Sequence, residues 1–240
     1  MFHQIALLFS AKTWFLISLI FLTSFSACAP NYRTEKITPP SPAVEQKIKD
    51  LYLDIALQKK VSYSLFRTAM VGFYNLPGLT KEAKLVLIDF SKPSTKKRLY
   101  VLDLQNKKLL FQSLVAHGRN SGKVTPTQFS NDHKSKQSSL GFYKTGETYQ
   151  GKNGYSLRLD GLEQGINHHA RQRSVVIHGA DYASQAFIKK NGRLGRSWGC
   201  PALPFALNKD IIDAIKNKSA VFIYAPNKTY QRDSPYMVPQ

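Results

Sequence analysis

Residues 85–116 read LVLIDFSKPSTKKRLYVLDLQNKKLLFQSLVA, with three short apolar runs separated by polar stretches. The runs at 85–90, 98–104 and 109–116 are rich in branched and aromatic side chains, which favour β-strands. Residues 105–107, of sequence QNK, separate the last two runs and are typical of a hairpin turn. We therefore expect a mainly β domain to begin near residue 85.

The same pattern of short apolar runs continues toward the C-terminus. Residues 156–160, 174–178 and 220–225 are further predicted strands. Between the last two, residues 205–216 place Ile211, Ile212 and Ile215 on one face of a predicted helix. Many short strands with few helices are typical of a β-sandwich or barrel. Residues 85–226 thus predict a β-sandwich or barrel-like domain with one helix near the C-terminus.

The segment before this domain has helical rather than strand periodicity. Its apolar residues over 43–80 form two stripes, Val44, Ile48, Leu51 and Ile55, then Leu65, Ala69, Phe73 and Leu76. Ser41 and Pro42 suit a helix start, as the cap and the first helical residue. We expect a small helical hairpin over 43–80, a proline-rich linker over 29–42 and a flexible polar tail over 227–240.

Residues 1–28 have the composition of an export signal. They hold one lysine, an apolar run too short for a typical membrane span, and small residues before Cys28. The sequence Phe25-Ser26-Ala27-Cys28 resembles a bacterial lipoprotein signal, in which the cysteine is acylated. Cleavage after Ala27 or Ala29 and a retained N-terminal anchor are the alternatives. The leader predicts export to the periplasm or cell envelope, with Cys28 as the lipidation candidate.

The formal net charge of +19 is high, and the basic residues are spread along the chain. Such a charge suits nucleic acid, an anionic membrane face or a polyanionic envelope. An exported chain rarely meets nucleic acid, and no basic helix or RNA-binding signature is present. The charge therefore indicates a solvated basic surface or association with the envelope, and we expect no nucleic-acid partner. The sequence gives no signal for an oligomeric state.

Cys200 is the only cysteine outside the leader, so it has no internal disulfide partner. It lies between Gly199 and Pro201, with Ser197 and Arg196 close by, whereas a structural free cysteine is usually a small buried hydrophobe. Glycine lets a substrate carbonyl approach, and backbone amides near Gly199 and Cys200 are candidates to bind an oxyanion. Nearby arginines favour a thiolate. These neighbours indicate a nucleophile rather than a core residue.

His178 follows the apolar residues 175–177 and precedes a glycine, so it is expected at the exit of a buried strand. A lone histidine is by default structural, but beside Cys200 it is the natural base. Arg119 lies in a second polar loop, 117–122, which either lines the cleft or is only a turn. His168 and His169 have no carboxylate or thiol at ligand spacing, so we expect no metal site and no cofactor.

The motif His178-Gly179, followed by Ser197-x-Gly199-Cys200, resembles the signature of the YkuD-type L,D-transpeptidases of bacterial cell walls. The longer strings 178–182 and 195–202 resemble the branch called murein L,D-transpeptidase catalytic domain 2. Residues 138–149 and 156–162 are also similar to that branch. The resemblance covers roughly residues 45–226.

This resemblance implies an L,D-transpeptidase-like β fold and a cysteine acyltransferase. Cys200 would form a thioester with one peptidoglycan stem peptide, His178 would act as base, and Ser197 and Gly199 would complete the catalytic motif. The amine of a second stem would then accept the acyl group, without metal or cofactor. Substrate contacts are expected from Arg196, Arg193, Trp198, Tyr182 and Arg119.

The chain departs from the family signature beside the nucleophile. Trp198 replaces a histidine often found two residues before the cysteine, and Pro201-Ala202 replaces an apolar residue followed by arginine or asparagine. Another arginine must then hold the substrate, or the acceptor differs. An L,D-carboxypeptidase with the same dyad and a non-catalytic wall-binding protein are the alternatives. An exported cysteine protease is a third, for which the chain has no recognisable motif.

Overall fold

The computed structural model describes residues 32–238, so the leader, Cys28 and the first linker residues lie outside the described part. The predictions of a signal peptide and of lipidation at Cys28 fall there. Within residues 32–238, no helix has both the length and the apolar character needed to cross a bilayer.

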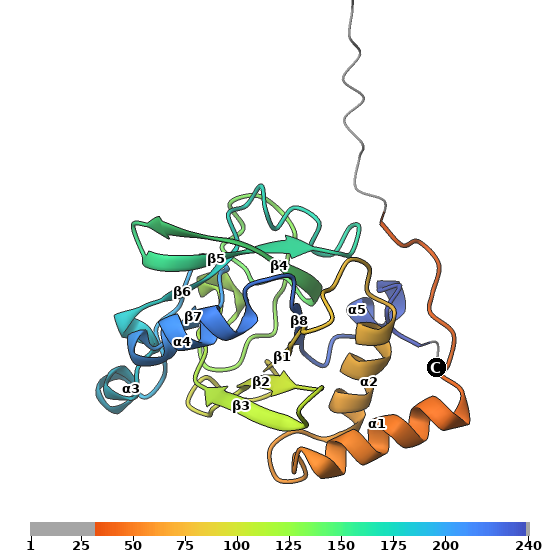
Figure 1. The fold of residues 1–240 in the computed structure, drawn as a ribbon. Helices are drawn as coiled ribbons and strands as arrows, with labels where there is room; N and C mark the ends of the chain where they lie inside the picture. Colours follow the sequence, from red (N-terminus) through yellow and green to blue (C-terminus); the bar gives the residue numbers. More distant parts are fainter. Residues whose placement is uncertain (1–31, 239–240) are drawn as a thin grey trace, which may run out of the picture. The chain divides into compact units, whose positions relative to one another are not determined.

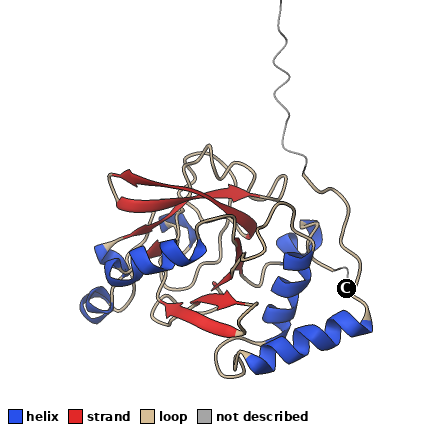
Figure 2. Cartoon of the chain, viewed as in Figure 1, coloured by secondary structure: helices blue, strands red, loops and turns tan. Residues whose placement is uncertain are grey.

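Eight strands form one sheet in the order β3-β2-β1-β8-β4-β5-β6-β7. Their bounds are β1 Leu85–Asp89, β2 Leu99–Asp103, β3 Lys108–Ser113, β4 Gly141–Gly151, β5 Gly154–Gly161, β6 Val176–Gly179, β7 Ala202–Leu203 and β8 Ala220–Tyr224. Neighbouring strands are antiparallel except for the pairs β1–β8 and β6–β7, which are parallel. Figure 2 shows these strands in red, with the long β4–β5 hairpin extending beyond its neighbours.

The two edges of the sheet approach each other, so the sheet is nearly closed. Ala116, just beyond β3, forms an antiparallel bridge with Ala202 in β7, and Gly118 forms a parallel bridge with Ser197. These bridges bring the loop after β3 to the residues that precede β7. The predicted mainly β, barrel-like fold class is confirmed.

The core lies between the central strands and two N-terminal helices, α1 (Pro42–Asp54) and α2 (Tyr63–Tyr74), drawn in orange in Figure 1. Every residue of β1 and β2 is buried, which explains their unbroken apolar runs. Phe142 in β4 stacks on Phe222 in β8 with ring centroids 4.2 Å apart. A Cβ at Gly72 in α2 would lie 2.1 Å from the Phe142 ring, so glycine permits this close packing.

Three shorter helices complete the structure: α3 (Gln185–Asn191), α4 (Phe205–Ile215) and α5 (Lys228–Asp233). The flexible tail predicted from the polar sequence after residue 226 is wrong for residues 227–238. Tyr230 and Tyr236 are buried in the main core, and the Tyr230 hydroxyl donates to Glu163 at 3.2 Å. Two aromatic side chains thus fix a segment whose composition is otherwise that of a solvated tail.

His117, directly after β3, is fully buried and belongs to the scaffold. Arg98 Nη2 donates to its Nδ1 at 2.8 Å, and its Nε2 donates to the Gly122 carbonyl at 3.2 Å. Burial, together with the nearby Arg98 charge, lowers the pKa of His117 to about 3. Both ring nitrogens of this neutral imidazole are occupied, and the ring holds the loop that carries Arg119.

Candidate active site

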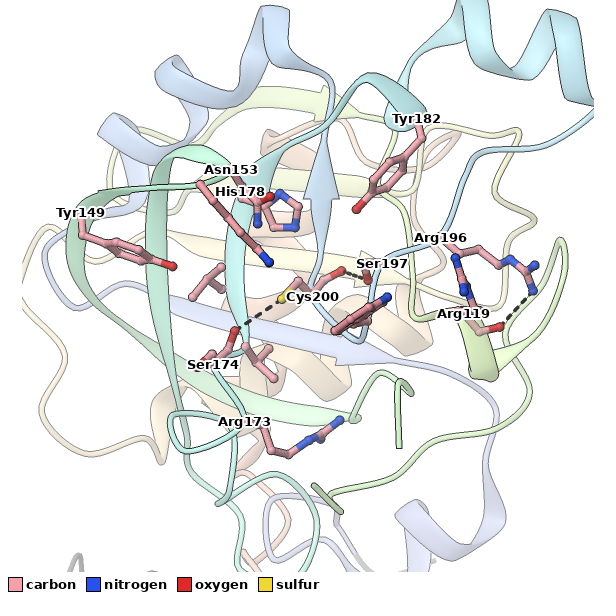
Figure 3. A pocket seen from close by; sticks show the side chains of 14 residues that line it. Arg119, Tyr149, Asn153, Arg173, Ser174, His178, Tyr182, Arg196, Ser197 and Cys200 are labelled. Atoms are coloured by element: carbon pink, nitrogen blue, oxygen red, sulfur yellow. Dashed lines mark hydrogen bonds between the residues drawn. The ribbon is translucent and has the colours of Figure 1, made fainter. Parts of the chain in front are cut away.

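The candidate nucleophile and base come from neighbouring strands. His178 in β6 pairs with Ala202 in β7, and its amide donates to the Pro201 carbonyl at 3.4 Å. Residues two apart in an extended segment point to the same face. Cys200 therefore faces the same side as His178, and both line one cavity of about 520 Å³. Figure 3 shows the His178 ring and the Cys200 sulfur at this cavity.

His178 is held in the tautomer that a base requires. Its Nδ1 donates to the Gly179 carbonyl at 2.8 Å, which leaves the Nε2 lone pair without a partner among residues 32–238. The side chain is only 4% exposed, and burial lowers the pKa of His178. The imidazole is therefore neutral and able to accept a proton. The Gly179 carbonyl therefore fixes the tautomer of the His178 ring.

The Cys200 thiol is protonated in the resting structure. Burial raises its pKa, and the opposing effects of the Val176 backbone and of the Arg173 charge are smaller. Its Sγ donates to the Ser174 carbonyl at 3.5 Å, as the dashed line in Figure 3 marks. The site thus pairs a neutral thiol with a neutral imidazole rather than a preformed ion pair.

Ser197 shapes the turn that carries the sulfur. Its hydroxyl accepts from the Gly199 amide at 3.0 Å and donates to the Cys200 carbonyl at 2.6 Å. The Gly199 amide is therefore occupied, contrary to its expected role in binding an oxyanion. The Cys200 amide has no acceptor among residues 32–238 and is the available donor.

Gly199 is required by packing rather than by substrate approach. Its φ of +128° lies in a region that side chains rarely adopt, and a Cβ would lie 2.7 Å from the Gln137 carbonyl oxygen. The loop that contains Gln137 therefore packs directly against the turn.

The three arginines expected at the substrate have different surroundings. Arg119 lines the cavity, is exposed, and its guanidinium has no acceptor among residues 32–238. Arg196 also lines the cavity, but its Nη1 donates to the carbonyls of Arg119 and Gly122 at 2.9 and 3.2 Å. Arg193 does not line the cavity, and its Nη1 donates to the Leu194 carbonyl at 2.7 Å. Arg119 is therefore the arginine most open to a ligand.

Trp198 and Tyr182 both line the cavity, as expected for substrate contacts. Trp198 is 67% exposed, and the Lys136 ammonium lies 5.0 Å from its ring centre. Tyr182 belongs to the short 3-10 helix Asp181–Ala183, and burial raises its pKa to about 12. The indole thus offers an aromatic surface at the rim, and the phenol stays protonated.

Seven lining residues are not among the site residues expected from the sequence. They are Tyr149, Lys152 and Asn153 of the β4–β5 hairpin, Arg173, Ser174 and Val175, which precede β6, and Val176, the first residue of β6. The dipeptide Asn153-Gly154 is a strong hairpin signal and could have placed a turn here. No residue lining the cavity is acidic, so the cavity favours an anionic ligand. Residues 32–238 hold no group of three metal-ligating side chains.

Comparisons with known proteins identify the family of the chain. The L,D-transpeptidase catalytic domain family model matches residues 57–224. No curated protein sequence matches the chain.

Similar solved structures include an L,D-transpeptidase from Mycobacterium smegmatis, at 12% identity and TM-score 0.37, covering 59% of this chain and 58% of that one. Another comes from Stackebrandtia nassauensis, at 14% identity and TM-score 0.37, covering 75% of this chain and 77% of that one. The match thus spans little more than half the length of the first of these proteins. The family assignment rests on the family model, which matches more than half of the chain: this protein belongs to the L,D-transpeptidase catalytic domain family.

Proposed function

We propose that this protein transfers acyl groups between peptidoglycan stem peptides through a thioester on Cys200. The observation that supports this best is the neutral thiol and the neutral imidazole with a free Nε2, facing one cavity without carboxylates. Family membership supports the reaction class. The cavity charge suits stem peptides, which carry carboxylates.

In the first half-reaction, His178 Nε2 takes the Cys200 thiol proton as Sγ attacks a carbonyl carbon of the donor stem. The negative charge moves to the carbonyl oxygen, where the free Cys200 amide donates a hydrogen bond. The carbon–nitrogen bond then breaks, and the released terminal residue takes the proton from the His178 imidazolium. A thioester remains on Cys200.

In the second half-reaction, the side-chain amine of another stem attacks the thioester carbon. His178 accepts the proton that this amine loses, and the carbon–sulfur bond breaks. The sulfur leaves as thiolate and regains the proton from His178. A new amide links the two stems, and the free enzyme is restored.

Arg119 anchors a carboxylate of the donor stem, because it lines the cavity and its guanidinium has no protein partner among residues 32–238. Arg196 instead binds backbone carbonyls of the loop that carries Arg119. Arg119 thereby replaces the arginine that Pro201-Ala202 leaves out of the family signature.

The test is product analysis by mass spectrometry after incubating the purified protein with disaccharide tetrapeptide. We expect a crosslinked dimer that has lost one terminal residue, and no product from Cys200→Ala. Tripeptide without dimer would show an L,D-carboxypeptidase. Binding without turnover by the wild-type protein would show a wall-binding protein.

We also propose that the protein is exported and anchored in the envelope by acylation of Cys28, on the strength of its leader sequence alone. Growth with labelled palmitate should label the wild-type protein but not Cys28→Ala. Absence of label from the wild-type protein would leave simple cleavage or a retained anchor.

A further inference from the structure

Arg173 lies at the base of the cavity, in the segment just before β6 (Figure 3). It is half-buried and directly precedes Ser174, whose carbonyl accepts the hydrogen bond from the Cys200 thiol. Ser174 has a φ of +55°, a conformation uncommon outside glycine and asparagine. One short segment therefore supplies both the carbonyl that contacts the sulfur and a guanidinium that lines the same cavity.

The guanidinium of Arg173 is held entirely by neutral groups. Its Nη1 donates to the Ser130 carbonyl at 2.7 Å and to the Ser139 hydroxyl at 2.5 Å. Its Nη2 donates to the Gln137 carbonyl at 2.7 Å and to the Ser135 hydroxyl at 3.2 Å. Four of its five N–H groups are thus occupied, which leaves little capacity to grip a substrate carboxylate. No salt bridge within residues 32–238 includes Arg173. Burial lowers the pKa of Arg173, and the negative charge of Asp132, in the same 130–139 loop, acts in the opposite direction.

This charge lies close to the turn that carries the nucleophile. A Cβ placed on Gly199 would be 3.4 Å from Arg173 Nη2. Burial raises the pKa of Cys200, and the Arg173 charge acts in the opposite direction. A cation fixed in a partly desolvated site stabilises a nearby anion more than one in water does.

Other polar groups face the sulfur without supplying such a fixed charge. His178 of β6 is neutral and serves as the proton acceptor, and Tyr182 stays protonated. Arg119, Arg196 and Lys152 also line the cavity, and Figure 3 draws Arg119 and Arg196 to the right of Cys200 and Arg173 below it. Arg173 is the cation whose charge lowers the pKa of Cys200 against the effect of burial.

We propose that Arg173 is a positioning residue that stabilises the Cys200 thiolate through its positive charge, which the 130–139 loop holds in place. When the proton moves from Cys200 Sγ to His178 Nε2, the sulfur becomes negative and the imidazole positive. Arg173 favours the negative half of this pair and takes no proton itself. The inference rests on the proposed function only in taking Cys200 as the nucleophile.

The test measures the apparent pKa of Cys200 from the pH dependence of its alkylation by iodoacetamide, read by mass spectrometry on the Cys200 peptide. No stem peptide is needed, so failure of transpeptidation and failure of this inference are distinguishable. Arg173→Gln, which keeps an amide donor but no charge, should raise the apparent pKa by about one unit. Arg173→Lys should restore most of that shift.

Arg171→Met is the matched control, because it removes a positive charge two residues away that Glu147 and Asp160 already neutralise. It should leave the alkylation profile unchanged. An unchanged profile in Arg173→Gln, or equal shifts in Arg173→Gln and Arg173→Lys, would overturn the proposal and leave Arg173 as a brace for the loop.

A second pair of variants tests whether Arg173 acts by its charge if Arg173→Gln does not fold. Ser135→Asp places a carboxylate beside Arg173 Nη2, whereas Ser135→Asn has nearly the same shape without the charge. We expect the Asp variant to have a higher thiol pKa than the Asn variant by about half a unit or more. Equal values in the two variants would contradict an electrostatic role.

Discussion

His117 and His178 are both buried histidines at the ends of strands, yet they differ in how many of their ring nitrogens have a hydrogen-bond partner. Arg98 and the Gly122 carbonyl occupy both nitrogens of His117. Only Nδ1 of His178 is occupied, and its Nε2 faces the cavity. Burial lowers the pKa of both rings. A free lone pair in the cavity that also holds the thiol, rather than burial or a low pKa, therefore distinguishes the candidate base from the scaffold histidine.

The largest effect is expected from removing the free lone pair. His178→Ala should lower kcat/KM by about 10²–10⁴-fold, since a positioned base contributes about that much. The free energy of unfolding should change by only about 1 kcal/mol, because one hydrogen bond is lost. Kinetics with stem peptides and urea titration measure the two quantities. Retained activity with a large loss of stability would make His178 a second scaffold histidine.

The converse substitution should act on stability. His117→Ala removes one acceptor of the buried Arg98 guanidinium and leaves a cavity, so the free energy of unfolding should fall by about 2–4 kcal/mol. Activity per folded molecule should be nearly unchanged. The exposed His133 provides the control, and His133→Ala should change stability by about 0.5 kcal/mol or less. If both variants were equally stable, the comparison would fail.

The low pKa of His117 predicts a pH dependence of stability. The unfolded chain takes up a proton near the ordinary pKa of 6.5, whereas folded His117 takes one up only near pH 3. The unfolded state thus binds more protons in this window, and stability falls as pH decreases, by about 1.4 kcal/mol per unit from this group. Urea titrations at pH 5 and 7 should show a smaller difference in His117→Ala. An identical difference in both proteins would show that His117 is not the group responsible.

The smallest effect concerns the aromatic contact of His117. The Phe90 ring lies edge-on to the His117 ring, with centroids 5.9 Å apart. The Arg98 guanidinium lies 4.7 Å from the centre of the Phe90 ring. Phe90→Leu should lower the free energy of unfolding by about 1 kcal/mol and leave kcat/KM unchanged. A fall in kcat/KM measured on the folded protein would mean that the two histidine regions are coupled.

Strands with buried apolar runs could be predicted from the sequence because their pattern is local. The expected strands at 85–90 and 220–225 coincide closely with β1 and β8. β4 could not be predicted from the sequence, because its residues GFYKTGETYQG form no apolar run. Its pairing with β5 and β8 decides its structure. α3 has seven residues and no buried side chain, so it carries no periodic signal.

In the candidate site, too, only the residues with local sequence signatures could be predicted. Cys200 and His178 have local signatures, and the structure brings both to one cavity. Tyr149 comes from the β4–β5 hairpin, and the 130–139 loop holds the Arg173 guanidinium, so their places in the cavity depend on contacts between segments far apart in the sequence. Arg193 is closer to Cys200 in sequence than Arg173 is, yet its side chain turns back to the adjacent carbonyl.

The two-residue strand β7 limits where insertions and deletions can occur in this protein. The register pairs Ala202 with His178, and Cys200 precedes Ala202 by two residues and lines the same cavity as His178. Inserting or deleting a single residue between Cys200 and Ala202 would shift the sulfur relative to His178, because the pairing fixes Ala202. The excursion from Gly179 to Leu194, which contains α3, tolerates such changes because it leaves and rejoins the sheet without setting this register. Natural length variation should therefore accumulate in the excursion and be absent from the step between the thiol and the strand.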